Sequence, residues 1–211
     1  YSKFDPSVIS LLQSYSNGVN AYIEERKGNY SIEFDVLGYQ PEKWKPMHSL
    51  IVIKMMAWEL NISWWTDVTF SELIQKLGEK KAMEILPDYP ENAPTIIAEN
   101  FKYLPLINSS LVETDQAFRK FIGWTGTHLG SNNWVVNANK SKSGKPIIAN
   151  DPHLAFSAPG KWYAATVNSK EGWKASGVTL PGVPGIVIGK GENISWVLTN
   201  VMNDDSDFYS P

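Results

Sequence analysis

The chain has 211 residues, of which 43% are hydrophobic and 19% are charged, so it carries enough apolar material to bury a core and disorder is not expected. Its formal net charge is −3 and it has no long run of like charge, which argues against nucleic acid as a partner. The longest apolar run, residues 50–58, is interrupted by Lys54 and is too short to cross a bilayer, so no membrane partner is expected. The chain contains no cysteine, which excludes disulfides, thiolate nucleophiles and cysteine metal sites.

The first half of the chain predicts mainly helices. Asp5 before Pro6 is typical of a helix start, and apolar residues then recur at intervals of three and four until close to Gly28. Residues 47–64 are apolar nearly all round, which favours a buried helix. Shorter helices are expected at residues 71–77, 80–85 and 111–122.

One short strand is expected within this helical half. Ile32, Phe34 and Val36 alternate with other residues at a spacing of two, which is the period of a strand.

The composition changes near Gly130 towards Gly, Asn, Ser, Val and Trp in short runs, which is typical of strands separated by turns. Strands are expected at residues 134–136, 147–149, 162–167, 186–188 and 195–198. Helices first and strands afterwards predict an α+β fold, or a layered sheet with helices packed on it.

Both ends of the chain suggest a piece of a longer protein. The sequence starts at Tyr1 without an initiator methionine, and it stops at Pro211 directly after an acidic cluster without a closing element. We therefore expect a fragment.

The dipeptide Gly130-Ser131 offers a route to a nucleophile that needs no cysteine. Glycine can hold backbone angles that other residues cannot, which leaves the Gly130 carbonyl open to the Ser131 hydroxyl. Attack would convert the amide into an ester, and hydrolysis would release Ser131 with a free α-amine. Because such an amine has a pKa of roughly 7.7–8.0, it can act as the base for the hydroxyl beside it. Taken alone, Gly-Ser is also a common turn dipeptide.

The sequence around this dipeptide resembles the sequences of a known family. Downstream, GSNNWVV, KPIIANDPHLAFSAPGKWY, TLPGVPGIVIGKGENISWVLTN and DDSD are similar to the penicillin acylase family of N-terminal-nucleophile hydrolases. Upstream, LQSYSNGVNAYIE, FDVLGYQPEKWKPMHSLIVIKMMAWEL and LPDYPENAP resemble its smaller chain. The resemblance covers most of the chain and keeps the order and spacing of the motifs.

This resemblance implies a fold and a division of the chain. The fold would be part of the four-layer αββα arrangement of N-terminal-nucleophile hydrolases. Residues 1–130 would form the mostly helical small-chain region, with a spacer at about 103–130, and residues 131–211 would begin the β-rich large chain.

The resemblance also implies roles for individual residues. Ser131 matches the serine released by autoproteolysis after Gly130, and would be the nucleophile. His153 matches a position close to that nucleophile, although a histidine that only hydrogen-bonds a turn is an alternative. Asn200 matches the position whose backbone N–H helps to form the oxyanion hole. Asn132 and Trp134 match residues that seat the serine.

A calcium site is the cofactor that the resemblance implies. Asp204 and Asp207, with the carbonyl of Ser206 between them, match calcium ligands of the family, and Asp67 is the nearest match for a ligand from the smaller chain. Oxygen donors of this kind suit calcium. A solvated acidic loop is the alternative.

A pocket for the acyl group is the third implied site. Met56 and Leu60, one helical turn apart, match pocket-lining positions and would face Ile188. An apolar pair at this spacing also occurs in ordinary cores.

Together with the resemblance, these features predict an amidohydrolase that cleaves small-molecule N-acyl amides of the penicillin or cephalosporin type, or related acyl amides. The resemblance also implies the remaining large-chain segment as a protein partner and a periplasmic or secreted location. Two alternatives stay open: an acyl-homoserine lactone acylase, and a non-catalytic binding domain that kept the fold.

Overall fold

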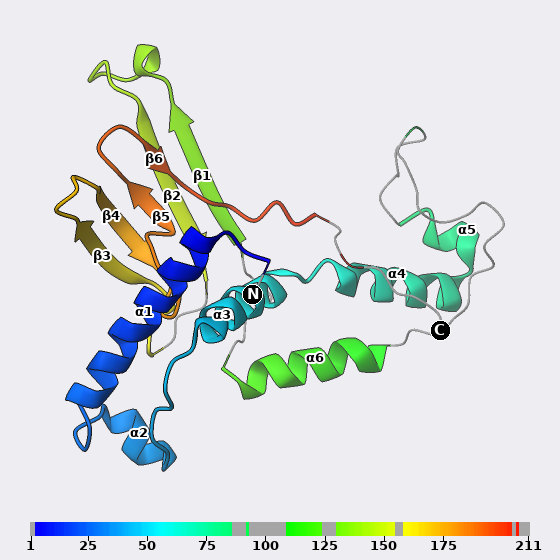
Figure 1. The fold of residues 1–211 in the computed structure, drawn as a ribbon. Coiled ribbons are helices and arrows are strands. Elements are labelled where there is room, and N and C mark those ends of the chain that lie inside the picture. The colour runs from blue at the N-terminus through cyan, green and yellow to red at the C-terminus, as the bar shows by residue number, and fades with distance from the viewer. Residues whose placement is uncertain are drawn as a thin grey trace. The chain divides into compact units, whose positions relative to one another are not determined.

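The structure is a computed structural model, and it describes residues 3–85, 92, 109–123, 130–154, 158–203 and 206. The chain divides into two compact units (Figure 1). The first unit is formed by residues 1–58 and 130–199, and the second by residues 59–129 and 200–211. Each unit combines residues from both sides of Gly130. This division concerns packing, so the expected division of the chain at residues 130 and 131 stays a prediction.

Helix α1, Pro6–Glu25, opens the first unit and begins where the sequence predicts. The Asp5 carboxylate accepts hydrogen bonds from the Ser7 backbone N–H at 2.8 Å and from the Ser7 hydroxyl at 2.6 Å. These bonds lower the pKa of Asp5, because they favour its charged form. Leu12 is buried, and the Ser16 hydroxyl donates to its carbonyl.

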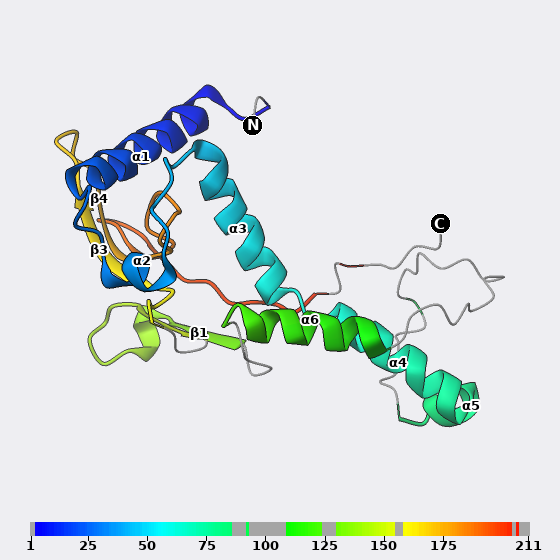
Figure 2. The same ribbon diagram turned by 90° about the horizontal axis from the view of Figure 1, so that it is seen from below.

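Two polar contacts fasten α1 within the first unit. The Asn20 side-chain amide donates to the Trp44 carbonyl at 2.9 Å and accepts from the Trp44 N–H at 2.7 Å. The Tyr15 hydroxyl accepts from the Gly182 N–H at 2.9 Å. In Figures 1 and 2, α1 accordingly lies beside the larger sheet.

Residues Ile32–Leu37 form helix α2, so the prediction of a strand here is wrong. Ser31 stands at the N-cap, Glu33 lies in the first turn, where the helix dipole favours a negative charge, and Gly38 ends the helix with φ of 69°. Ile32 is 72% exposed, so the alternation does not mark a buried strand face.

Three helices follow: α3 (Pro46–Leu60), α4 (Trp64–Leu77) and α5 (Glu79–Ala82). The helix predicted for residues 47–64 therefore ends early, and Trp64 begins the next one. The predicted boundary at Gly78 is confirmed, with φ of 78°. The expectation that α3 is buried is wrong among the described residues, because side chains such as Met47 and Ile51 are exposed.

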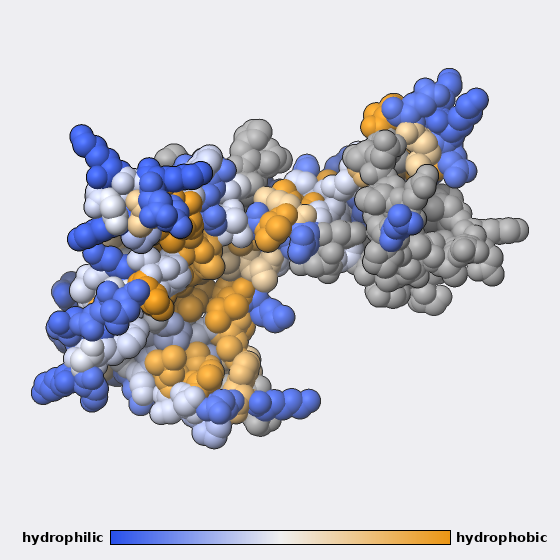
Figure 3. All heavy atoms as spheres, turned by 90° about the horizontal axis from the view of Figure 1, so that it is seen from above, coloured by the Kyte–Doolittle hydropathy of each residue, from blue (hydrophilic) through white to orange (hydrophobic). Residues whose placement is uncertain are grey.

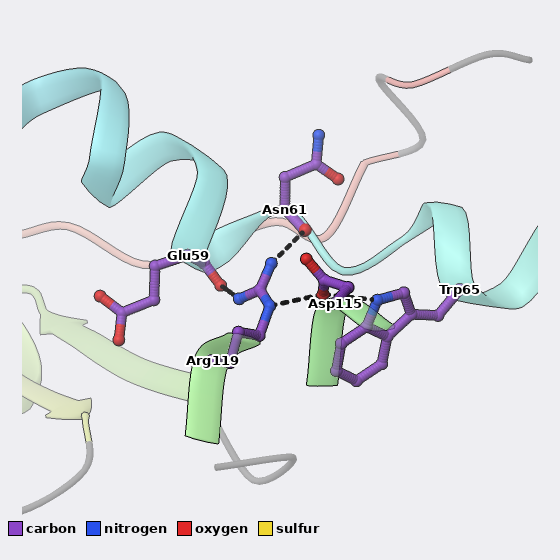
Figure 4. Close-up of polar contacts among 5 residues, drawn as sticks. All are labelled: Glu59, Asn61, Trp65, Asp115 and Arg119. Atoms are coloured by element: carbon purple, nitrogen blue, oxygen red, sulfur yellow. Dashed lines mark hydrogen bonds and ion pairs between the residues drawn. The ribbon is translucent and has the colours of Figure 1, made fainter. Parts of the chain in front are cut away.

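Helix α6, Ser109–Phe121, is fastened in the second unit by a buried arginine (Figure 4). Arg119 is 5% exposed, and its Nε donates to Asp115 at 2.6 Å. Its Nη1 donates to the Glu59 carbonyl at 2.8 Å and its Nη2 to the Asn61 carbonyl at 3.5 Å, at the carboxyl end of α3. Trp65 donates its indole N–H to the same Asp115 at 3.1 Å. We call this group the Arg119 clasp.

The strands form two antiparallel sheets in the first unit. Strand β1 (Gly130–Val136) pairs with β2 (Ile147–His153). The four-stranded sheet has the order β3-β4-β5-β6, formed by Tyr163–Asn168, Lys174–Thr179, Ile188–Lys190 and Ser195–Trp196. The mixed α+β class is confirmed, whereas the four-layer arrangement rests on the family alone.

The connection between β1 and β2 is built from its own hydrogen bonds. Asn137 caps a short turn, Ala138–Lys140, by accepting from the Asn139 N–H at 3.0 Å. The Ser141 hydroxyl donates to the Lys145 carbonyl at 2.6 Å, and Ser143 accepts from the Lys145 N–H at 3.3 Å. All of these hydrogen bonds join residues of the hairpin tip itself, 137–145.

Strand β4 was not predicted, because its sequence KASGVT is small and polar except for one valine. Its Gly177 lies opposite Gly189 of β5. A Cβ on Gly177 would collide with the Ile188 carbonyl oxygen, and one on Gly189 with the Ser176 carbonyl oxygen. Two side-chain-free positions therefore permit this close pairing.

Few hydrophobic residues are buried in the described part of the chain: Leu12, Val68, Ala82, Ala175 and Leu180. Hydrophobic residues, drawn orange in Figure 3, also reach the surface, and Trp134 and Val135 of β1 are 64% and 70% exposed. Among the described helices, none combines the length and apolarity that a bilayer crossing requires.

Candidate functional site

The Gly130-Ser131 pair lies at the start of β1, opposite the end of β2. Gly130 is in register with His153, and Ser131 with Pro152. The structure thus places two candidate residues from the sequence analysis, Ser131 and His153, at neighbouring register positions of one hairpin.

Strand alternation puts the two candidate side chains on opposite faces of this hairpin. His153 shares its face with Asp151 and Asn132, while Ser131 shares the other with Asn150 and Pro152. The His153 Nε2 lies 3.2 Å from an Asp151 carboxylate oxygen, and its side chain is 47% exposed. The imidazole therefore does not meet the Ser131 hydroxyl here, and the role of His153 stays a prediction.

Gly130 adopts ordinary strand geometry. It is not among the glycines with positive φ, so the expectation that it holds angles barred to other residues is not supported. Among the described residues, no atom outside its chain neighbours lies within 4 Å of the place a Cβ would take. An alanine would therefore fit at this position, and ordinary extended backbone explains the conformation.

Residues 197–199 lie beside this hairpin through side-chain contacts. The Thr199 hydroxyl donates to the Ser131 carbonyl at 2.8 Å. The Asn150 amide nitrogen donates to the carbonyls of Asn132 and Leu198, both at 2.9 Å, and its oxygen accepts from the Leu198 N–H at 3.2 Å. We call these last three bonds the Asn150 clasp.

A hollow of about 590 Å³ lies between the two sheets of the first unit. It is lined mainly by apolar side chains, among them Ile188, Pro152 and Trp196, with Asn150 at its wall. Because Pro152 and Asn150 share the face of Ser131, the hollow adjoins that face of the hairpin. Ile188 lines this hollow, whereas Met56 and Leu60 do not, and the role of all three in binding an acyl group stays a prediction.

Met56 and Leu60 are half-buried neighbours on α3. Met56 belongs to the first unit and Leu60 to the second. The Leu60 carbonyl accepts from the Asn200 side-chain amide at 3.0 Å. That amide carbonyl oxygen in turn accepts from the Met202 N–H at 3.0 Å, so the Asn200 side chain holds the backbone of the second unit.

The described part of the expected calcium set lies in the second unit. Ser206 accepts from the Asn61 amide at 2.6 Å, at the connection between α3 and α4, and Asp67 lies in the first turn of α4. Asp204 and Asp207 lie outside the described residues. Within the described ranges, no group of three or more histidine, aspartate or glutamate side chains could hold a metal ion.

Sequence reasoning missed Asn150, Thr199 and Arg119. Asn150 stands in the quoted segment KPIIANDPHL, but nothing in the sequence indicates that its side chain bonds Leu198, 48 residues later. Arg119 likewise bonds a carbonyl 60 residues away. Non-local pairing of this kind has no signal in one sequence.

Comparison with known proteins places these features in context. A model of the penicillin amidase family matches residues 2–210. An acyl-homoserine lactone acylase QuiP of Pseudomonas aeruginosa is 32% identical over 213 residues, covering 99% of this chain and 25% of that protein. A penicillin acylase 2 proenzyme of Pseudomonas sp. (strain SE83) is 27% identical, covering 94% of this chain and 26% of its own length.

A more distant relative is a penicillin G acylase of Escherichia coli, 23% identical over 257 residues, covering 97% of this chain and 30% of that protein. The chain thus spans about a quarter of the length of the curated relatives it matches first. No solved structure matches it.

Proposed function

The chain belongs to the penicillin amidase family, and from this premise we propose that its parent protein hydrolyses the amide bond of small N-acyl compounds through an acyl-enzyme on Ser131. The observation that carries the proposal is the placement of Ser131 at the start of β1, on the face that adjoins the hollow between the sheets. A nucleophile at a strand end beside an apolar hollow suits an acyl group.

Maturation would come first. The Ser131 hydroxyl oxygen attacks the Gly130 carbonyl carbon, the C–N bond between the two residues breaks, and the hydroxyl proton moves to the departing amine. Water then hydrolyses the ester, which leaves a carboxylate on Gly130 and a free α-amine on Ser131.

Turnover would use the same hydroxyl. The α-amine takes its proton as the oxygen attacks the substrate carbonyl, and returns the proton to the leaving amine. Water then releases the carboxylic acid from the ester on Ser131. With a pKa of roughly 7.7–8.0 for the amine, activity should rise as pH increases through this range.

The backbone N–H of Asn200 would stabilise the oxyanion. Its chain neighbour Thr199 is bonded to the Ser131 carbonyl, which supports a role for this stretch near the nucleophile. Such a donor is worth about 3 kcal/mol in the transition state.

The hollow lined by Ile188 would receive the acyl group, and Met56 and Leu60 would complete its wall as the family resemblance implies. An acyl-homoserine lactone is the second candidate substrate class. The 32% identity to a protein named acyl-homoserine lactone acylase favours it, compared with 27% for the named penicillin acylase 2 proenzyme. Both classes present the same acyl-amide bond.

Calcium, location and protein partner complete the proposal. Asp67, Asp204, Asp207 and the Ser206 carbonyl would hold a structural Ca²⁺, and their hard oxygen donors fit that ion. The parent protein would act in the periplasm or outside the cell. Its remaining large-chain segment would cover apolar side chains such as the exposed Trp134 and Val135.

The test is the intact mass of the full-length protein under denaturing conditions, beside a Ser131→Ala variant. We expect two chains in the wild type, one beginning at Ser131, and a single uncut chain in the variant. Release of free carboxylic acid is then measured with acyl-homoserine lactones and with penicillin-type amides. One uncut chain in both samples, or no hydrolysis by the cut protein, would overturn the proposal and favour a non-catalytic binding domain.

A further inference from the structure

We propose that Asn150 is a positioning residue for the reaction proposed above, on which this inference rests. Its side-chain amide fixes the position of residues 198–199 against β1. It thereby helps to place the backbone N–H of the next residue, Asn200. Asn150 would not touch the reacting atoms. It would act through residues 198–199, whose backbone it helps to position.

The three bonds of the Asn150 clasp join three parts of the first unit. The amide stands on β2, donates to the Asn132 carbonyl on β1, and both donates to and accepts from Leu198. The two bonds to Leu198 use one N–H and one C=O on each side, as two peptide groups do in a sheet. A side-chain amide therefore replaces a backbone partner.

Such a replacement is needed because the regular ladder stops short. Strand β6 ends at Trp196, and its register pairs it with β5 rather than with β1. Residues 197–199 are thus outside every described strand. The Thr199 hydroxyl, bonded to the Ser131 carbonyl, provides a second anchor one residue later.

The consequence is that two side chains, Asn150 and Thr199, set a geometry that a series of backbone hydrogen bonds would otherwise set. Oxyanion donors act at distances of about 2.7–3.1 Å, so a small slip of the segment costs transition-state stabilisation while leaving the acyl hollow in place. The expected signature is a lower kcat with little change in KM.

The chain offers a matched control. Asn20 holds Trp44 with the same pair of bonds, one given by the amide nitrogen and one received by its oxygen, in the same unit. Both of these bonds go to Trp44, and neither involves residues 130–136 or 197–199. Asn20→Leu therefore removes an equivalent amide clasp away from the proposed site.

The experiment compares wild type, Asn150→Leu, Asn150→Gln and Asn20→Leu in the processed full-length protein. For Asn150→Leu we expect kcat to fall about 10- to 100-fold with KM within about threefold, and the affinity for a boronic acid transition-state analogue to fall in parallel. Asn150→Gln keeps donor and acceptor and should recover part of kcat. Asn20→Leu should keep kcat near that of the wild type.

The outcomes separate the two proposals. A wild type without turnover overturns the proposed function itself, and the positioning role with it. An active wild type in which Asn150→Leu keeps kcat, or loses no more than Asn20→Leu, overturns the inference alone. If Asn150→Leu does not fold, Thr199→Val and Thr199→Ser decide: kcat lost only in the valine variant supports the anchored segment, and equal kcat in both overturns it.

Discussion

In each of the two units, a polar side chain forms hydrogen bonds with backbone groups far away in the sequence. The chemistry of these side chains differs between the two units. In the first unit, the half-buried neutral amide of Asn150 bonds Leu198. In the second, the buried guanidinium of Arg119 bonds Asp115 and the Glu59 carbonyl. If the hydrogen bonds of a neutral amide near solvent are lost, water can replace them. If one partner of a buried ion pair is lost, the other is left as an unpaired buried charge.

The two clasps also differ in how long they would persist. Arg119 lies within residues 103–130, which the family resemblance implies are a spacer, while Asn150 lies beyond it. If the spacer is excised, the Arg119 clasp is removed with it, whereas the Asn150 clasp is retained. Under the proposed maturation, the Arg119 clasp would therefore exist only in the uncut chain, and the Asn150 clasp would also exist in the processed protein.

The largest expected effect is on the charged clasp. In the uncut Ser131→Ala protein, Arg119→Met should lower the stability of the second unit by about 3–5 kcal/mol, because it leaves the Asp115 carboxylate in a buried site. Hydrogen exchange of peptides from α4 and α6 measures this. Adding Asp115→Leu to Arg119→Met should recover part of the loss. Unchanged protection in Arg119→Met would contradict a buried, energetically coupled ion pair.

A smaller effect tests what holds the larger sheet of the first unit. Gly177→Ala places a methyl group against the Ile188 carbonyl, so stability should fall by about 1–3 kcal/mol. The control is Gly191→Ala, whose new methyl would lie no closer than 3.4 Å to its nearest described neighbour, the Lys174 carbonyl. Chemical denaturation followed by tryptophan fluorescence distinguishes them. Equal stabilities would mean that the close β4–β5 approach is not required.

The smallest effect concerns the exposed cap of α1. Hydrogen bonds from Ser7 lower the pKa of Asp5, so its contribution is present above the unfolded pKa and is lost as pH falls through the lowered folded value. Asp5→Asn keeps the acceptor oxygen but does not titrate. The difference in Tm between wild type and variant should therefore change between pH 6 and about pH 3. A difference that stays constant with pH would contradict the role of the charge.

Much of the fold follows from local signals in the sequence. Asp5-Pro6 marks the start of α1, and Gly78 separates two helices, because caps and glycine breaks act within a few residues. The same logic failed at Ile32–Leu37, where an alternating pattern was outweighed by a capping serine, acidic first-turn residues and a terminal glycine. Strand β4 escaped prediction because cross-strand pairing with its neighbours, rather than its own composition, makes it a strand.

The candidate site was predictable only in part. The family resemblance picked out Ser131 and His153, and the hairpin register makes them neighbours. That register also puts their side chains on opposite faces, which the resemblance alone could not reveal. The Asn150 and Arg119 clasps depend on contacts across 48 and 60 residues, so only a folded chain exposes them.

The self-contained tip of the β1–β2 hairpin gives the experimenter a handle. Its bonds run among residues 137–145 and it lies at the opposite end of β1 from Ser131, with Ser143 exposed. Since the 211 residues contain no cysteine, Ser143→Cys creates a single thiol within them. A fluorophore attached there would follow the folding of the hairpin in real time while leaving the Ser131 end of the strand chemically unchanged.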